Sequence, residues 1–176
     1  RTGKLFGYMH YEVTPDLVTC GKGVSSGLPL SLVLGSQKVM DLSEIGSMSS
    51  THSANPLSSI AGHHCLKEIV DRDLVNRAKN LGEVFHKRLN QIKEKFPKHL
   101  KYVFGKGMIA GLVFIDEKGK PLTKLCDLIS EEALRRGLIV VHTGRESIKL
   151  GPPITIHEDA LMEGIQVLEE CIEDLI

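Results

Sequence analysis

The first residue whose surroundings suggest chemistry is Lys22, which stands between two glycines in a predicted turn. The apolar residues Leu17 and Val18 lead into the turn, and Gly21 and Gly23 flank the lysine. Glycines allow backbone conformations with positive φ and let a bulky ligand approach the chain closely. A lysine amine that faces a pocket rather than water can act as a nucleophile and form a Schiff base with a carbonyl compound. A Gly-Lys-Gly tripeptide also occurs as an ordinary solvated turn, so these residues alone leave both interpretations open.

A second candidate is the hydroxyl-rich segment of residues 46–55, which reads GSMSSTHSAN and includes Thr51. It precedes Pro56, which suits the first position of a helix, with Asn55 as the N-cap. Hydroxyls and unpaired backbone N–H groups ahead of a helix are donors that suit a phosphate group. A solvated linker has a similar composition, so this segment alone does not decide between the two.

Other side chains give no sign of a metal site. Adjacent residues on a helix point in different directions, so His63, His64 and Cys65 cannot easily hold one ion with tetrahedral geometry. The chain has four cysteines and no Cys-x-x-Cys pair, which favours neither zinc nor a disulfide framework and suits a reducing compartment.

Composition excludes several classes of protein. The chain has 22 Lys and Arg against 22 Asp and Glu, so a nucleic acid or an anionic membrane is not expected as its main partner. No apolar run approaches the length of a membrane span. The first residues do not resemble a signal or transit peptide, and we expect a cytoplasmic protein. Since the chain opens at Arg1 without an initiator Met, we also expect it to be part of a longer protein.

The periodicity after residue 73 predicts a compact α+β unit. Apolar residues at helical spacing predict a helix from residue 74 that Pro97 terminates; they are Leu74, Ala78, Leu81, Phe85, Leu89, Ile92 and Phe96. Strands are expected at 102–104, 108–115, 138–141 and 147–150. Helices are expected at 122–136, closed by Gly137, and at 158–176.

Residues 1–73 have a different composition, with more Gly and Ser and shorter apolar runs. They predict strand-like structure at 5–8, a buried strand within 28–35, a helical turn at 37–42 and a helix from Pro56. One or two strands cannot form a core of their own, so this part is expected to need further partners.

Three segments resemble, in order, motifs of the class III aminotransferases, which are pyridoxal-phosphate (PLP) enzymes of fold type I. Residues 15–23 (PDLVTCGKG) followed by 27–30 (GLPL) resemble the segment of the cofactor lysine. Residues 50–57 (STHSANPL) resemble the Thr-x-x-x-Asn-Pro-Leu segment, and 148–154 (IKLGPPI) resemble the Pro-Pro segment near the C-terminus. Because residues 1–6 (RTGKLF) also match, the resemblance covers nearly the whole chain.

The resemblance implies an α/β fold of the PLP-transferase type. Residues 1–73 would be the end of the large PLP-binding domain, and 74–176 the small C-terminal α+β domain. Lys22 would form the internal aldimine with pyridoxal 5'-phosphate and then act as the general acid and base of the reaction. Thr51 would donate its hydroxyl to the cofactor phosphate of the neighbouring subunit, so a homodimer is implied.

At two positions the resemblance concerns the substrate. Many members of the family have an arginine at the position of Lys149, where it pairs with the substrate carboxylate. Lysine offers a point charge in place of a planar fork, which leaves open an ω-amine, an amino sugar or a substrate held otherwise. Arg145, four residues earlier, could supply the fork, and a solvated turn arginine is an equally good interpretation. His52 and Phe104 also depart from the family, which often has an aromatic residue at the first position and an arginine at the second.

The implied reaction is transfer of an amino group from an amine or amino-acid donor to a 2-oxo acid. A racemase, aminomutase or lyase of the same fold would use the same lysine, and an inactive fragment that serves as an interaction module is a third possibility. The family's phosphate loop, ring-stacking aromatic residue and ring-nitrogen aspartate would all lie before Arg1. We therefore expect activity in the full-length parent and not in this chain alone.

Overall fold

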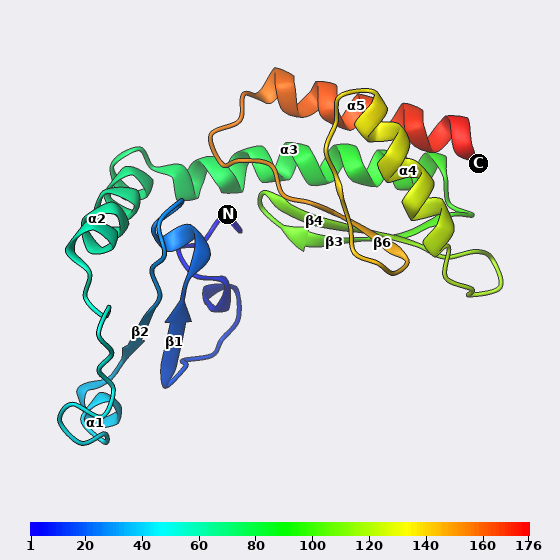
Figure 1. Ribbon diagram of the computed structural model, residues 1–176. Coiled ribbons are helices and arrows are strands. Elements are labelled where there is room, and N and C mark those ends of the chain that lie inside the picture. Colours follow the sequence, from blue (N-terminus) through cyan, green and yellow to red (C-terminus); the bar gives the residue numbers. More distant parts are fainter. The chain divides into compact units, whose positions relative to one another are not determined.

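The computed structural model describes all 176 residues, and the chain divides into two compact units (Figure 1). One unit is Val75–Ile176 together with Arg1–Phe6, and the other is Gly7–Leu74. None of the helices combines the length and the apolar character that crossing a membrane requires.

The unit of residues 75–176 is built on a four-stranded antiparallel sheet in the order β3-β4-β6-β5. Its strands are β3 (Leu100–Lys106), β4 (Ile109–Phe114), β5 (Val141–His142) and β6 (Ser147–Leu150). Side chains alternate between the two faces of a strand. Ala110, Leu112, Phe114 and Ile148 are almost fully buried on one face, whereas their neighbours along the strands remain at least partly exposed.

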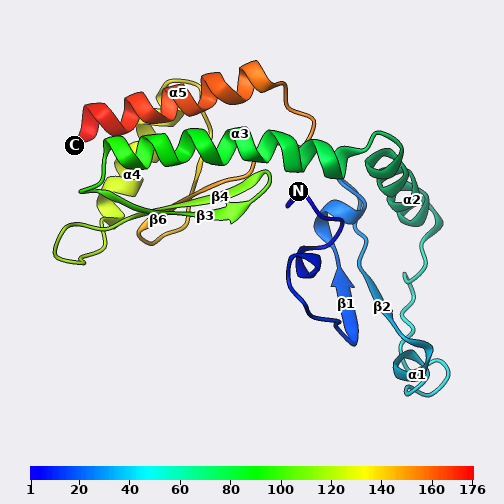
Figure 2. The ribbon, with the colours of Figure 1, turned by 180° about the vertical axis from the view of Figure 1, so that it is seen from behind.

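Three helices accompany this sheet: α3 (Leu74–Lys95), α4 (Thr123–Arg135) and α5 (Glu158–Leu175). In both views α3 and α5 run side by side on one side of the sheet (Figure 1, Figure 2). Helix α4 contacts α5, β4 and β6. All seven apolar residues that predicted the helix from residue 74 are buried, so that prediction is confirmed. Buried Glu169 of α5 also joins this helix pair, through ion pairs with Arg88 and Lys95 of α3.

One close approach in this unit requires glycine. A Cβ on Gly82 of α3 would lie 2.4 Å from the Cα of Gly107, which forms the β3–β4 turn with φ +56°. The helix can therefore touch the hairpin turn only because Gly82 has no side chain, whereas a Cβ on Gly107 would collide with the Arg1 carbonyl at 2.4 Å. The first residues of the chain join the same place, where the Met108 N–H donates to the Arg1 carbonyl over 2.8 Å.

The unit of residues 7–74 has few buried residues. It contains the short 3-10 helices η1 (Gly7–His10) and η2 (Lys22–Val24), the antiparallel strands β1 (Leu17–Cys20) and β2 (Leu32–Gly35), and the helices α1 (Gln37–Met40) and α2 (Pro56–Asp71). The large apolar cluster of the molecule contains none of its residues. A two-stranded sheet has no second layer to cover it, which explains why β2 is exposed and not the buried strand that its sequence predicted.

Two other predicted strands differ from the structure. Residues 138–141 form a strand only from Val141, because the Leu138 N–H donates to the Ala133 carbonyl and so completes the end of α4. Gly137 has φ +84° there, as expected of the residue that closes a helix. Residues 5–8 have no strand partner, and Gly7–His10 forms a 3-10 turn in their place.

Candidate active site

Lys22 occupies an unusual backbone conformation at the end of β1. Gly21 is extended, and Lys22 then has φ +51°, in the left-handed region, as the first residue of η2. A non-glycine residue in this region costs on the order of 1 kcal/mol, and such residues concentrate at functional sites. The side chain is exposed within its unit and its amine has no hydrogen bond or ion pair. Within its unit, therefore, Lys22 faces solvent and not a pocket, and its amine has no partner in the protein.

The back of this turn is fixed by helix α2. The Cys65 thiol lies 3.5 Å from the Gly23 carbonyl, and a Cβ on Gly62 would collide with the Leu30 side chain at 2.5 Å. Ser25 is buried and donates its hydroxyl to the Leu28 carbonyl. These contacts hold the backbone on either side of Lys22, while its side chain remains unrestrained.

Thr51 lies in the exposed loop between α1 and α2, where its hydroxyl has no partner. The neighbouring hydroxyls of Ser47, Ser49 and Ser53 donate instead to backbone carbonyls three residues earlier. Asn55 caps α2 as predicted, since its side-chain oxygen accepts from the Leu57 and Ser58 N–H groups at 3.0 and 3.2 Å. An exposed threonine hydroxyl without a protein partner therefore lies in the loop that precedes a 16-residue helix.

The same loop forms one wall of a polar hollow of about 470 Å³. Its other walls are the segment after the lysine turn, Pro29–Ser31, and the start of α2. Its polar side chains are those of Ser31, Ser50, His52, Ser53, Asn55 and Ser58. Neither Lys22 nor Thr51 lines it. Sequence reasoning missed this hollow, and the only available signal was the run of hydroxyl residues ahead of Pro56.

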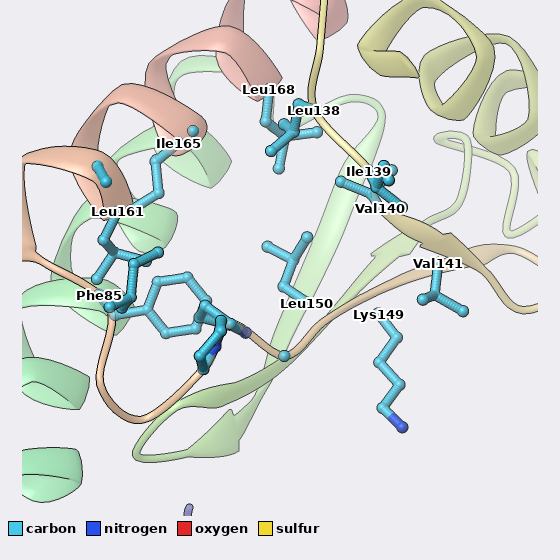
Figure 3. A pocket seen from close by; sticks show the side chains of 16 residues that line it. Phe85, Leu138, Ile139, Val140, Val141, Lys149, Leu150, Leu161, Ile165 and Leu168 are labelled. Carbon is cyan, nitrogen blue, oxygen red and sulfur yellow. The ribbon is translucent and has the colours of Figure 1, made fainter. Parts of the chain in front are cut away.

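Lys149, in the other unit, is an exposed cation on a sheet. Its neighbour Ile148 is completely buried, so the alternation of the strand directs Lys149 to the opposite face. Lys149 is one of the residues that line a hollow of about 260 Å³ next to α5, and its side chain extends away from the apolar lining residues (Figure 3). It forms no ion pair or hydrogen bond, so its charge is available to a ligand.

Arg145 lies in the turn between β5 and β6, and its side chain is 78% exposed. The backbone of this turn is fixed by His142, whose Nδ1 lies 2.6 Å from the Asp127 carboxylate and whose Nε2 lies 2.8 Å from the Arg145 carbonyl. This contact could not be predicted from the sequence, because Asp127 belongs to a different element, α4.

Two of the four thiols can be excluded as nucleophiles. Burial raises the pKa of Cys126 to about 12, and the nearby Asp127 and Glu146 charges act in the same direction. Burial also raises the pKa of Cys171 in α5. A nucleophilic thiol must ionise, so Cys126 and Cys171 are not candidates for the catalytic nucleophile.

The comparisons with known proteins agree with these motifs. The family model described as "Aminotransferase class-III" matches residues 1–172. The chain is 34% identical over 178 residues to an alanine/serine racemase of Pyrococcus horikoshii, and the match covers 100% of this chain and 37% of that protein. It is 34% identical over 176 residues to the mitochondrial ornithine aminotransferase of Arabidopsis thaliana, which matches 98% of this chain and 36% of the relative.

Solved structures give the same result. The acetylornithine aminotransferase of Elizabethkingia anophelis superposes with a TM-score of 0.89 at 30% identity, over 99% of this chain and 43% of that one. The chain thus spans less than half the length of these relatives, and its fold is the α/β fold type I of the PLP-dependent transaminases. The chain belongs to the class III aminotransferase family.

Proposed function

We propose that the protein to which this chain belongs transfers an amino group from an amine or amino-acid donor to a 2-oxo acid, with pyridoxal 5'-phosphate as cofactor. The observation that carries the proposal is the unpaired Lys22 amine on a left-handed backbone, inside the segment that resembles the family's cofactor lysine. Membership of the family supports the same reaction.

The residues present fit this cofactor. A free amine suits its aldehyde, and the unsatisfied Thr51 hydroxyl suits its phosphate. When bound, the cofactor supplies an electron sink for the carbanion at the substrate Cα. Lys22 would hold it covalently and, once released, take the proton from that carbon, which is the task of a general base.

Thr51 is proposed to act on the cofactor of a second subunit in a homodimer. Its exposure in the loop before α2 supports this, because a hydroxyl that reaches another chain must be free of partners in its own. We also propose that residues 1–73 complete the large domain and that residues 74–176 form the small one.

Lys149 is proposed to bind the substrate carboxylate, with Arg145 as a second cation. The exposure of both side chains supports this role, and Lys149 has no competing ion pair. Lysine would attract a carboxylate without imposing the planar two-bond geometry of arginine.

Racemisation of an amino acid is the second candidate. One relative at 34% identity is an alanine/serine racemase, and the same lysine would serve that reaction. The two reactions separate after the proton leaves Cα, because transfer releases a 2-oxo acid and racemisation returns the amino acid.

We propose a cytoplasmic location. The four cysteines are all free, which suits a reducing compartment, although the Arabidopsis relative is mitochondrial. Fractionation of cells that express the full-length protein tests the location.

The reaction is tested by incubating the full-length protein with an amino acid and no acceptor. Transfer predicts about one equivalent of 2-oxo acid per subunit, whereas racemisation predicts loss of optical activity with no oxo acid. Lys22→Ala should lower either rate by at least about 10²-fold. Lys38→Ala, which removes an exposed lysine of α1, is the matched control and should leave the rate unchanged. Normal turnover in Lys22→Ala would contradict the assignment.

A further inference from the structure

The face of the β3-β4-β6-β5 sheet that carries Lys149 has an ordered row of side chains. The strand register pairs Phe104 with Gly111, Gly111 with Lys149, and Lys149 with Val141. Directly paired residues share a face of the sheet. Across the four strands, in the order β3-β4-β6-β5, the row therefore consists of an aromatic ring, a glycine, a lysine ammonium group and a valine.

Gly111 is the unusual member of this row. It lies in the interior of β4, where glycine weakens a strand, and its φ is not positive. A Cβ built on it would meet no atom within 4 Å. Neither conformation nor packing within this unit requires glycine here, and a glycine inside a strand can mark the close approach of a ligand.

The residues around Gly111 form a shallow apolar site with charge at one side. Phe104 is 58% exposed and stacks on Tyr102 at 5.4 Å between ring centroids. Ile109 and Val113, half-buried on the same face, flank the glycine along β4. Two strand spacings separate Phe104 from Lys149, which is about 10 Å between their Cα atoms.

We infer that Phe104, Gly111 and Lys149 of this row select a substrate with one carboxylate and a bulky apolar or aromatic side chain. The carboxylate pairs with Lys149, and the side chain lies over Gly111 against the Phe104 ring. This inference rests on the proposed function, because it assigns the substrate class of the proposed reaction. Phe104 and Gly111 are then specificity-determining residues.

The charges and side chains on this face favour this substrate over a dicarboxylate and over a peptide segment. Lys106 is a second cation on this face, but it is paired with Ile109 at the end of the hairpin, one step beyond the aromatic ring. A dicarboxylate that reached both lysines would cover the apolar residues only with its thin connecting chain, which leaves most of the exposed Phe104 ring in water. A peptide segment laid over Gly111 would cover Lys149 without supplying a negative charge, which is unfavourable.

The test is calorimetric binding of unreactive carboxylates to the full-length protein loaded with cofactor. The probes are butyrate, 3-phenylpropanoate and glutarate, none of which has an amino or oxo group to react. We expect 3-phenylpropanoate to bind about tenfold more tightly than either of the others, which is the contribution of one aromatic contact.

Variants locate that preference. Gly111→Leu should weaken 3-phenylpropanoate about tenfold and change butyrate less than about threefold, because it fills the space beside the ring. Gly111→Ala, whose methyl group fits the free space, and Phe104→Ala should each reduce the preference without loss of folding. Val141→Ala, on the other side of Lys149, is the matched control and should retain it.

Two results would overturn the inference: tighter binding of glutarate than of 3-phenylpropanoate, or an unchanged preference in both Gly111→Leu and Phe104→Ala. Binding is measured without turnover, so its outcome is separate from that of the proposed reaction. If the protein prefers 3-phenylpropanoate but transfers no amino group, the proposed reaction is refuted and the proposed binding site is retained. Transfer in a protein without the preference would refute only the site.

Discussion

Isoleucines in helices are buried in one unit of the chain and exposed in the other. Ile92 of α3 is fully buried, whereas Ile60 of α2 is 61% exposed, although both belong to helices of at least 16 residues. Helix α3 lies over a four-stranded sheet, and α2 belongs to a unit that has only a two-stranded one. Local sequence is therefore sufficient to form a helix, but burial of its apolar face depends on a second layer.

The difference has a consequence for function. Lys22 and Thr51 lie in the unit without a core, where their side chains are free but their surroundings are sparse. Lys149 lies on a sheet whose other face is fully packed, so its position is fixed by the core of its own unit. We expect the first unit to depend on the remainder of the full-length protein and the second to be independent of it.

Separate fragments give the largest expected contrast. A fragment of residues 75–176 should unfold cooperatively in urea, with a free energy of unfolding of about 5 kcal/mol, because it contains the apolar core. A fragment of residues 7–74 should show no cooperative transition by circular dichroism. Cooperative unfolding of the 7–74 fragment would contradict the expectation that this unit depends on the rest of the protein.

The cysteines provide a second contrast within the intact chain. Cys20 and Cys65 are partly exposed in the first unit, and Cys126 and Cys171 are buried in the second. With the pKa of Cys126 raised to about 12, about one thiol in 10⁴ is ionised at pH 8. Thiol labelling followed by mass spectrometry should therefore modify Cys20 and Cys65 at least about 100-fold faster. Equal labelling of Cys126 in the folded chain would contradict its burial.

A pair of identical substitutions compares the two helices directly. Ile92→Ala should lower the free energy of unfolding by about 2–5 kcal/mol, because it leaves a cavity in the core. Ile60→Ala should change it by less than about 0.5 kcal/mol, since its side chain is mostly in solvent already. Urea denaturation of the 176-residue chain measures both, and similar losses would show that α2 is buried as well.

The smallest expected effect concerns charges on α5. Glu169 is 8% exposed and pairs with Arg88 and Lys95, so Glu169→Gln should cost about 2 kcal/mol. Glu173 pairs with the same Lys95 but is exposed, and Glu173→Gln should cost less than about 0.5 kcal/mol. The same denaturation experiment compares them, and equal costs would mean that the buried pair does not join α3 to α5.

Sequence patterns predicted those parts of the fold that depend on local signals. The Asn55 cap, the seven buried positions of α3 and the Gly137 helix end were all predicted from residue types. Burial of residues 28–35 was predicted wrongly, because an apolar run shows what a strand could bury and not whether a partner exists. The motifs identified the family, but strand register is not visible in sequence. The row of Phe104, Gly111 and Lys149 therefore emerged only from the structure.

The most direct test of the account is reductive trapping of the cofactor on the full-length protein. Borohydride reduces the bond between a lysine and the cofactor to a stable secondary amine. Peptide mass spectrometry then identifies the modified residue. We predict that the added mass lies on the peptide that contains Lys22 and that Lys22→Ala carries no added mass. Modification of a different lysine, or of none after loading with pyridoxal 5'-phosphate, would contradict the central claim.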